Sequence, residues 1–402
     1  MKLDALKPLI DHDGPLTTVS MDVTRSDEAG DRDLRNRWQG LRRALEAQGA
    51  PASTVDAVAG LMLRQTHVPG PHGRLLVVGG PDGTEIVLDR ILAGAPTRDE
   101  AVHGGVPPLM PAAQAADESV RYLLVEVDRS GADLTWSGVD VPDAELSEHV
   151  EGGHDLVHKV RTGDWWHSRR TAARIEDSWE RNAQAVGTEL DRVVVAHRPE
   201  LVLLTGDVRA VAMIRDAVGH MVADLLVEVP GGSRTDGIKE DVFAARVHEA
   251  VEGYRARRRG VVVDRMAEAL GRGDGAVTEL GDVVEVLRRG QVAELVISSD
   301  TPPTFASRTL WVGTGPLELA LRRSELEGLG VDDTDATEMR ADVAVLRAAI
   351  AQDAGVTFDP TASVGLVDGI GAILRWSDPA TPHETAPAST RDHSRRAARS
   401  AD

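Results

Sequence analysis

The sequence predicts an α/β protein of three domains, each a mixed sheet with helices. Two patterns predict this class. Short apolar runs rich in β-branched residues alternate with longer segments whose apolar residues recur at helical spacing. In the middle of the chain, the apolar run 201–207 is followed by an amphipathic segment and by a second apolar run at 223–230. Buried strand, tight turn, helix and buried strand in this order are typical of a parallel α/β crossover.

The first predicted domain covers residues 1–116. A strand is expected over 16–23, and a helix over 31–48, where apolar residues recur every three or four positions. Two short apolar runs around a Gly-Gly-Pro-Asp-Gly string predict a hairpin over 74–88. The stretch 106–119 is rich in Pro and Ala, and is expected to be a linker to the next domain.

The second predicted domain covers residues 119–259 and contains the crossover. Its elements are expected in the order strand, strand, strand, loop, long helix, crossover and helix. They cover 121–128, 132–139, 155–161, 161–170, 171–197, 201–230 and 237–258.

The third predicted domain covers residues 260–376 and is again α/β. Helices are expected at 261–273, 280–291 and 334–352, and strands at 293–300, 310–313, 355–359 and 369–376. The tail 377–402 has almost no apolar bulk, so it is expected to be disordered.

Composition excludes several kinds of function. The chain has 402 residues and no cysteine, which removes thiolate catalysis, disulfides and cysteine-bound metals. No apolar run is long enough to cross a membrane and the first residues do not read as a secretory signal, so a cytoplasmic protein is expected. The net charge of −20 argues against nucleic-acid binding through the whole surface. Any contact with RNA therefore requires a local basic patch.

The residues 158–175 form such a patch. Five basic residues stand there against a single acidic residue, Asp164, and two tryptophans are adjacent. Cations pair with phosphates and flat rings stack on unpaired bases, so this mixture favours RNA binding. The alternative is that one tryptophan fills the domain core and the charges are simply solvated. The predicted RNA-binding residues are Lys159, Arg161, Gly163, Trp165, Trp166, His167, Arg169, Arg170 and Arg174.

Metal and cofactor sites are not expected. His154 and His158 are four residues apart, but the string between them lacks the glutamate of a zinc-protease motif. A cluster of arginines at 255–259 ends the helix expected at 237–258, where cations are favourable through the helix dipole alone. A contact of these arginines with RNA or with a partner is the other interpretation.

Several strings resemble a known family. The run 280–298 is similar to a helix, turn and buried strand in the third domain of archaeal and eukaryotic class-one release factors and of Pelota, and 369–376 is similar to that domain's last, glycine-rich strand. The run 157–160 and the long helix after it follow the order of the family's central domain. The layout resembles bacterial members of this family, including Balon-type ribosome hibernation factors.

The chain departs from the family at its catalytic and codon-reading motifs. Release factors carry Gly-Gly-Gln in the central-domain loop, but the loop 161–170 contains no glutamine. The first domain also lacks an Asn-Ile-Lys-Ser string, and a cysteine-containing codon-reading motif is impossible here. The sequence therefore does not predict an enzyme.

The resemblance implies a ribosome-binding translation factor that occupies the A site and blocks or protects idle ribosomes. Its implied partners are ribosomal RNA, tRNA and the GTPase elongation factor Tu, and a monomer is expected. The alternative is a hydrolase of peptidyl-tRNA or tRNA ends in ribosome rescue, with His167 or His158 as general base. A third reading is a stress-response scaffold that binds another protein.

Overall fold

The structure is a computed structural model. It is α/β, as predicted, and it divides into two compact units. Unit 1 consists of Met1–Glu118 and Arg258–Asp402, and unit 2 is Ser119–Arg257. Each of the three predicted domains contains a sheet of its own, and the three-domain division stays a prediction. The structure describes residues 3–12, 14–25, 28–66, 71–92, 94–96, 98–128, 130–137, 147–151, 165–233, 239–299 and 303–382.

The N-terminal part of unit 1 is built on a four-stranded antiparallel sheet of order β3-β2-β1-β4. One face packs on helices α2 and α3 through Trp38, Leu45 and Val55, and the other face contributes Leu16 and Leu75 to a larger core. The strands and helices are β1 (Leu16–Asp22), β2 (Gly73–Gly79), β3 (Glu85–Leu92), β4 (Glu100–Gly104), the 3-10 helix η1 (Asp4–Leu6), α1 (Lys7–Ile10), α2 (Glu28–Ala47), α3 (Ala52–Met62) and α4 (Met110–Glu118).

The expectation of a linker at 106–119 is wrong. Residues of α4 form a helix there, and Ala112, Ala113 and Ala115 are buried in the larger core of unit 1. Alanine has the highest helix propensity and no long side chain, so an Ala-rich segment packs closely against its neighbours. Pro107, Pro108 and Pro111 precede or begin this helix, where proline is tolerated.

The C-terminal part of unit 1 has two sheets, of order β10-β16-β11-β15 and β13-β12-β14. The first sheet packs on α9 and α11 through Val283, Leu295 and Leu346, in the same core that α1 and α4 join. The strands and helices are β10 (Ala276–Val277), α9 (Leu280–Arg288), β11 (Val292–Ser298), η2 (Thr304–Ser307), β12 (Thr309–Val312), β13 (Leu319–Ala320), α10 (Arg323–Glu327), β14 (Thr337–Arg340), α11 (Ala341–Ala351), β15 (Gly355–Asp359), η3 (Val367–Gly369) and β16 (Ile370–Leu374).

Two expectations for this part are wrong at their boundaries. The helix expected at 334–352 begins only at Ala341, because the residues of β14 pair with β12 in an antiparallel ladder. The tail is ordered for a few residues beyond 376: Thr381 is buried and accepts a hydrogen bond from Gln291 (2.8 Å). The remainder of the predicted disordered tail, from 383, lies outside the described residues.

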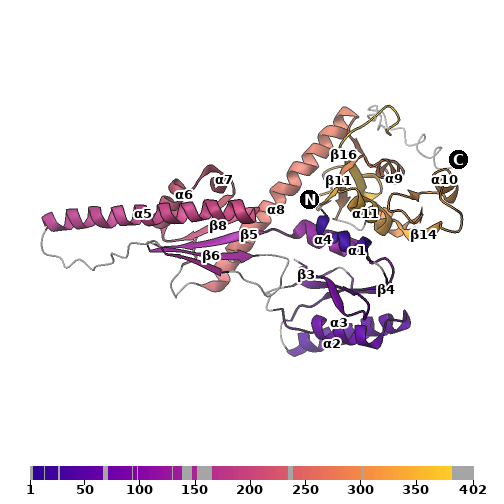
Figure 1. Cartoon of the computed structure of the whole chain (residues 1–402), viewed down its shortest axis with the longest axis horizontal. Helices are drawn as coiled ribbons and strands as arrows, with labels where there is room; N and C mark the ends of the chain where they lie inside the picture. The colour runs from indigo at the N-terminus through magenta and orange to yellow at the C-terminus, as the bar shows by residue number, and fades with distance from the viewer. Residues whose placement is uncertain are drawn as a thin grey trace. The chain divides into compact units, whose positions relative to one another are not determined.

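Unit 2 contains a five-stranded sheet of order β7-β6-β5-β8-β9. The parallel pairing of β5 with β8 and of β8 with β9 confirms the predicted crossover. Helices α5 and α6 cover one face, and the first part of α8 covers the other (Figure 1). The elements are β5 (Tyr122–Val127), β6 (Gly131–Ser137), β7 (Ser147–Glu151), α5 (Trp165–His197), β8 (Leu201–Gly206), α6 (Val208–Ala217), α7 (His220–Ala223), β9 (Leu226–Glu228) and α8 (Glu240–Arg272).

The turn between β8 and α6 requires glycine. Gly206 has φ +132°, and a Cβ built there would lie 1.9 Å from the carbonyl oxygen of Val127. No side chain fits this close approach of two strand ends. The strand can therefore end sharply, and the helix that follows can begin two residues later.

Three expectations for the middle of the chain need comment. The strand expected at 155–161 lies outside the described residues, while β7 lies just before it and pairs with β6. The helices expected at 237–258 and 261–273 are the single helix α8. Gly260 costs only about 1 kcal/mol inside a helix, and no proline stands near it, so the helix continues.

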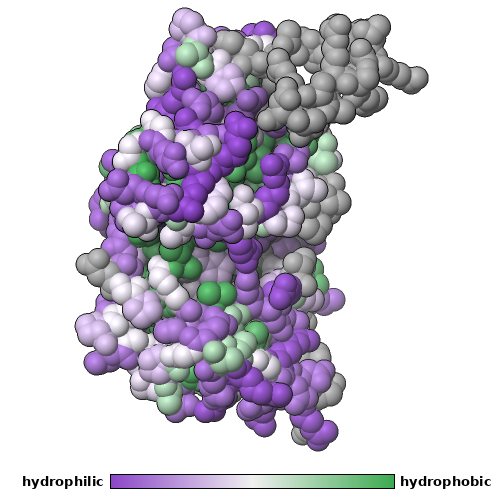
Figure 2. Space-filling view, turned by 90° about the vertical axis from the view of Figure 1, so that its right-hand side faces the viewer, coloured by the Kyte–Doolittle hydropathy of each residue, from purple (hydrophilic) through white to green (hydrophobic). Residues whose placement is uncertain are grey.

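Figure 2 shows a face on which hydrophilic residues cover most of the surface and hydrophobic residues appear as small separate patches. No helix in the part of the chain that the structure describes is both long and apolar enough to cross a membrane.

Candidate functional site

The residues predicted to bind RNA fall at the beginning of α5 and just before it. Lys159, Arg161 and Gly163 lie outside the described residues. The remaining six are in the first turns of α5: Trp165, Trp166, His167, Arg169, Arg170 and Arg174.

The loop expected at 161–170 therefore needs a correction. The helix begins at Trp165 rather than near residue 171. The string from Ser168 to Arg174 is rich in Ala and Arg, which are among the best helix formers, and contains neither Gly nor Pro. The sequence between Trp165 and residue 171 therefore contains nothing that prevents a helix from forming.

Helix α5 is much longer than the sheet it covers. Its 33 residues correspond to about 50 Å, whereas the six residues of β8 span about 20 Å. In Figure 1 the N-terminal half of α5 extends beyond the end of the sheet. Among the residues whose side chains the structure describes, those that bury α5 against the sheet include Val186, Leu190 and Val194 in its second half.

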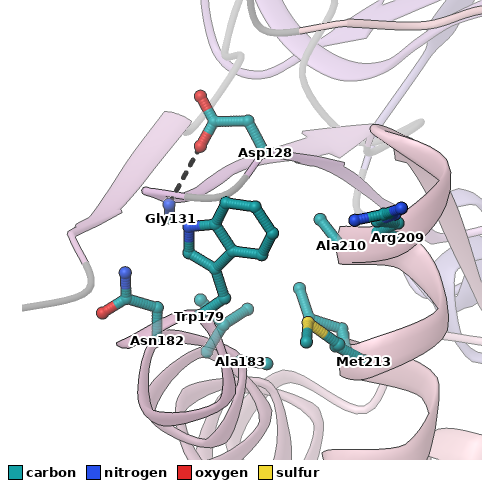
Figure 3. Close-up of a pocket in the computed structure, with 10 residues that line it drawn as sticks. Asp128, Gly131, Trp179, Asn182, Ala183, Arg209, Ala210 and Met213 are labelled. Carbon is teal, nitrogen blue, oxygen red and sulfur yellow. Dashed lines mark hydrogen bonds between the residues drawn. The ribbon is translucent and has the colours of Figure 1, made fainter. Parts of the chain in front are cut away.

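Trp179 is the first residue of α5 whose side chain the structure describes. Its indole lies between the turn that joins β5 to β6 and the first turn of α6 (Figure 3). The free space among these residues is about 10 Å³, which is room for one water molecule at most. Trp179 therefore fills a contact between elements and does not line a ligand site. The residues around it include Asp128, Gly131, Asn182, Ala183, Arg209, Ala210 and Met213.

Two aspartates stand at the carboxyl ends of the parallel strands β5 and β8. Asp128 accepts hydrogen bonds from the backbone and hydroxyl of Ser130 (both 2.7 Å) and from the backbone of Gly131 (3.0 Å). Asp207 caps α6 and accepts from the backbone N–H of Arg209 (3.0 Å) and Ala210 (3.2 Å). Both carboxylates stabilise turns, and this accounts for residue types that could otherwise be read as catalytic.

A cleft of about 450 Å³ opens at the same end of the sheet, between β8, β9 and α6. Three of its polar side chains have partners within the protein. Thr205 accepts a hydrogen bond from the backbone of Gly232 (3.0 Å), and Arg215 pairs with Glu228 (2.9 Å). Val208 at the rim is 84% exposed. The cleft therefore offers mainly apolar walls.

Three of the four arginines at the middle of α8 have partners within the protein. Arg255 pairs with Glu252 on the same helix. Arg258 donates to the backbone carbonyl of Asp117, and Arg259 pairs with the Asp117 carboxylate (2.7 Å), which is almost fully buried. These contacts favour the structural interpretation of this cluster. Sequence reasoning missed Asp117 because nothing local distinguishes it from the other acidic residues of the chain.

The charge of α5 changes along its length. Its first turn holds no acidic residue, although an acid there would be favoured by the helix dipole. Arg169, Arg170 and Arg174 follow, and acidic residues appear only from Glu176 onward. The helix dipole favours cations at the other end, so the dipole does not explain these arginines. Among the described residues, no three His, Asp or Glu side chains are grouped closely enough to hold a metal ion.

Comparison with known proteins gives a match for the region just described. Residues 121–272 match the family described as bacterial archaeo-eukaryotic release factor family 2. The uncharacterized protein Rv2629 of Mycobacterium tuberculosis is 24% identical over 383 residues, which are 94% of this chain and 97% of that protein.

Among solved structures, the chain is similar to Dom34 of S. cerevisiae, described as a translation termination-like factor (TM-score 0.36, 9% identity, 77% of this chain and 81% of that chain). It is also similar to archaeal Pelota in a ribosome-bound model with ABCE1 (TM-score 0.37, 11% identity, 94% and 95%). Both likenesses concern the fold alone.

Proposed function

We propose that this chain is a bacterial relative of the archaeo-eukaryotic release factors and a translation factor that binds the ribosome, because its residues 121–272 match that family. The observation that carries the proposal is the family match over 121–272, which includes the basic and aromatic start of α5. The proposed location is the cytoplasm, where ribosomes work.

In the finer form of the proposal, the protein occupies the A site and blocks or protects idle ribosomes. The segment 158–175 contacts ribosomal RNA or tRNA through its cations and its two tryptophans. The loop 161–170 lacks the glutamine that the release-factor reaction requires, which supports blocking rather than peptide release. Elongation factor Tu is the proposed protein partner, and the protein binds as a monomer.

The geometry of α5 supports an RNA contact at its beginning. The helix is held to the sheet through its second half and extends beyond it with the first (Figure 1). Trp166, Arg170 and Arg174 are spaced four residues apart, and positions at this spacing share one face of a helix.

Co-sedimentation with ribosomes tests the proposal. The wild-type protein is expected in the ribosome pellet at low salt, and the bound fraction should fall steeply as salt rises, because each phosphate contact releases counterions. The double variant R169E/R170E should weaken binding by about a hundredfold, since two phosphate contacts become repulsive. Arg181, exposed on the same helix outside the basic segment, gives the matched control R181E, which should bind like the wild type.

Two outcomes would reject the proposal. A protein that stays in the supernatant at low salt does not bind ribosomes. If R169E/R170E and R181E sediment equally, the basic segment does not make the contact.

The finer form is tested with ribosomes from resting cells: the protein should protect them from loading with aminoacyl-tRNA. If the wild type releases peptide from peptidyl-tRNA and His167→Ala does not, the hydrolase is favoured instead.

A further inference from the structure

Helix α2 of unit 1 carries a row of basic and amide side chains on its outer face. All of them are exposed, and each is three or four residues from the next, so they share one face of the helix. The members of this basic row are Arg32, Arg35, Asn36, Gln39 and Arg43. The opposite face of α2 is buried against the N-terminal sheet through Trp38 and Leu45. At the rise of an α-helix the row is about 16 Å long.

The arginines of the basic row have no carboxylate partner within the described part of the chain. Arg32 and Arg35 form no ion pair there, and Arg43 donates a hydrogen bond to the backbone carbonyl of Gln39 (3.2 Å). A guanidinium has five N–H donors, so most of them stay available for a ligand. The chain has 65 acidic and only 45 basic residues, and still places no carboxylate against these three arginines. They are therefore free to meet an anion from outside the chain.

Other arginines on the same helix are paired. Arg37 pairs with Asp22 (2.9 Å), and Arg42 pairs with Glu46 (2.8 Å). Asp33 is exposed on α2, but it directly follows a member of the basic row and therefore lies about 100° around the helix from it. The lack of partners is thus a property of the basic row and not of α2 as a whole.

Helix stability gives no reason for the basic row. Cations are favourable in the last turn of a helix, but the last turn of α2 holds no basic residue. Like charges three residues apart, as in Arg32 and Arg35, weaken a helix. The arrangement therefore costs stability in the free protein, and a bound anion would offset that cost.

A glycine beside the basic row leaves room for a partner to approach the helix. Gly40 lies four residues after Asn36 and three before Arg43, in the interior of α2, where glycine is less favourable than alanine. A Cβ built there meets no atom within 4 Å, and the φ of Gly40 is not positive, so neither packing nor backbone conformation requires glycine. This observation is independent of the charges, and it indicates close approach of a partner to this face.

We propose that the basic row binds the phosphate backbone of double-stranded RNA. Arginine, asparagine and glutamine side chains are among those that contact phosphates and sugars. From Gly30 to Ala47 the only aromatic residue is Trp38, which is buried, so no ring is available to stack on unpaired bases. The row also contains no apolar side chain that could anchor a protein partner. Duplex RNA is bound largely through its shape, its phosphates and its 2′-hydroxyls, which requires neither feature.

Fluorescence anisotropy of the full chain tests the proposal with two labelled probes, an RNA duplex of about 16 base pairs and an unstructured single strand of equal length. Both the wild type and R169E/R170E serve as parent proteins, so that a contribution of α5 is recognised. The duplex is expected to bind more tightly than the single strand.

The triple variant R32A/R35A/R43A should weaken duplex binding about tenfold to a hundredfold. The slope of log affinity against log salt should fall by about 3, one for each lost phosphate contact. Thermal stability should be unchanged or higher, because alanine is the best helix former and the like charges are gone.

The same helix offers a matched control. Arg42→Ala should bind the duplex like its parent, because Glu46 already pairs with this charge, and should not raise stability. Gly40→Leu should raise thermal stability, since leucine is a better helix former and its Cβ meets no neighbour. It should nevertheless weaken duplex binding, because the side chain stands where the RNA backbone approaches. A purely structural role of Gly40 would leave binding unchanged.

Weaker duplex binding in R32A/R35A/R43A together with normal binding in Arg42→Ala supports the proposal. If the single strand binds as tightly and depends on the same arginines, a duplex is not the partner and the proposal is wrong. If neither probe binds, or if the triple variant and Arg42→Ala behave alike, the basic row is not an RNA contact, and an acidic protein surface is the remaining partner. The inference goes beyond the proposed function: ribosome co-sedimentation of R169E/R170E reads the contact on α5 separately, so each proposal can fail alone.

Discussion

At the scale of single residues, several aspartates of this chain hold turns or helix ends. Asp207 is the clearest case, since its carboxylate accepts two backbone N–H groups at the start of α6. We expect Asp207→Ala to lower the free energy of unfolding by about 1 kcal/mol, because these N–H groups lose their acceptor. Urea denaturation measures the difference. Asp207→Ser keeps a capping oxygen and should recover most of the loss; equal loss in both variants would contradict the capping role.

Asp359, at the end of β15, predicts a pH dependence. Burial alone would raise the pKa of its carboxyl, but hydrogen bonds from Thr361 and Ser363 outweigh it and hold the pKa below the ordinary value of 3.8. The unfolded chain therefore binds this proton more readily than the folded protein. The stability contributed by the group is present above about pH 4 and is lost as the pH falls below it.

The corresponding variant is Asp359→Asn. It should lower the free energy of unfolding at pH 7 by about 1–3 kcal/mol. The two carboxylate oxygens accept four hydrogen bonds, and in the variant an NH2 group that cannot accept replaces one of them. It should also flatten the decline of stability between about pH 4 and pH 2. Thermal unfolding at several pH values checks both. An unchanged acid limb in the variant would show that other carboxyls control this range.

At the scale of elements, α5 has a second half that packs in unit 2 and a first half that is proposed to contact RNA. Its second half is part of the core of unit 2, and Leu190 there is fully buried. Leu190→Ala should destabilise unit 2 by about 2–5 kcal/mol, through lost apolar contact and a cavity. Val195, 58% exposed on the same helix, is the control, and Val195→Ala should change stability by less than about 0.5 kcal/mol. Denaturation followed by tryptophan fluorescence measures both variants.

Variants in the two halves of α5 can be compared for stability and for ribosome binding. If Leu190→Ala lowers stability but leaves ribosome binding intact at a temperature where the protein is folded, then docking and the proposed RNA contact are separable properties of one helix. A loss of both in R169E/R170E would instead indicate that the beginning of α5 is needed for folding.

At the scale of the whole molecule, residues from both ends of the sequence build unit 1. The carboxylate of Asp117 on α4 receives Arg258 and Arg259 from α8 within this unit. Asp117→Ala should destabilise unit 1 by about 3 kcal/mol, because it leaves two partly buried cations without their partner. Hydrogen exchange should then rise in 110–118 and 258–272, and stay unchanged in 201–217 of unit 2. Uniform faster exchange across both units would contradict this local role.

Part of this protein is determined by its sequence alone. Apolar runs and helical spacing predicted the α/β class and the crossover at 201–230, because a buried parallel strand needs a continuous apolar run. Local strings also carried the resemblance to release factors. The cluster of cations and tryptophans at 158–175 was visible for the same reason, since it is contiguous in the chain.

Other features were decided only by the tertiary structure. The Ala-rich segment 106–119 is a helix because a core from both ends of the chain receives it, and the arginines at 258 and 259 are paired because Asp117 lies beside them. A cavity at one end of the N-terminal sheet joins residues near 12, 54, 80 and 103 that no local pattern connects. Periodicity reports how a segment meets its own neighbours, whereas a site made from distant segments depends on how their backbones pack.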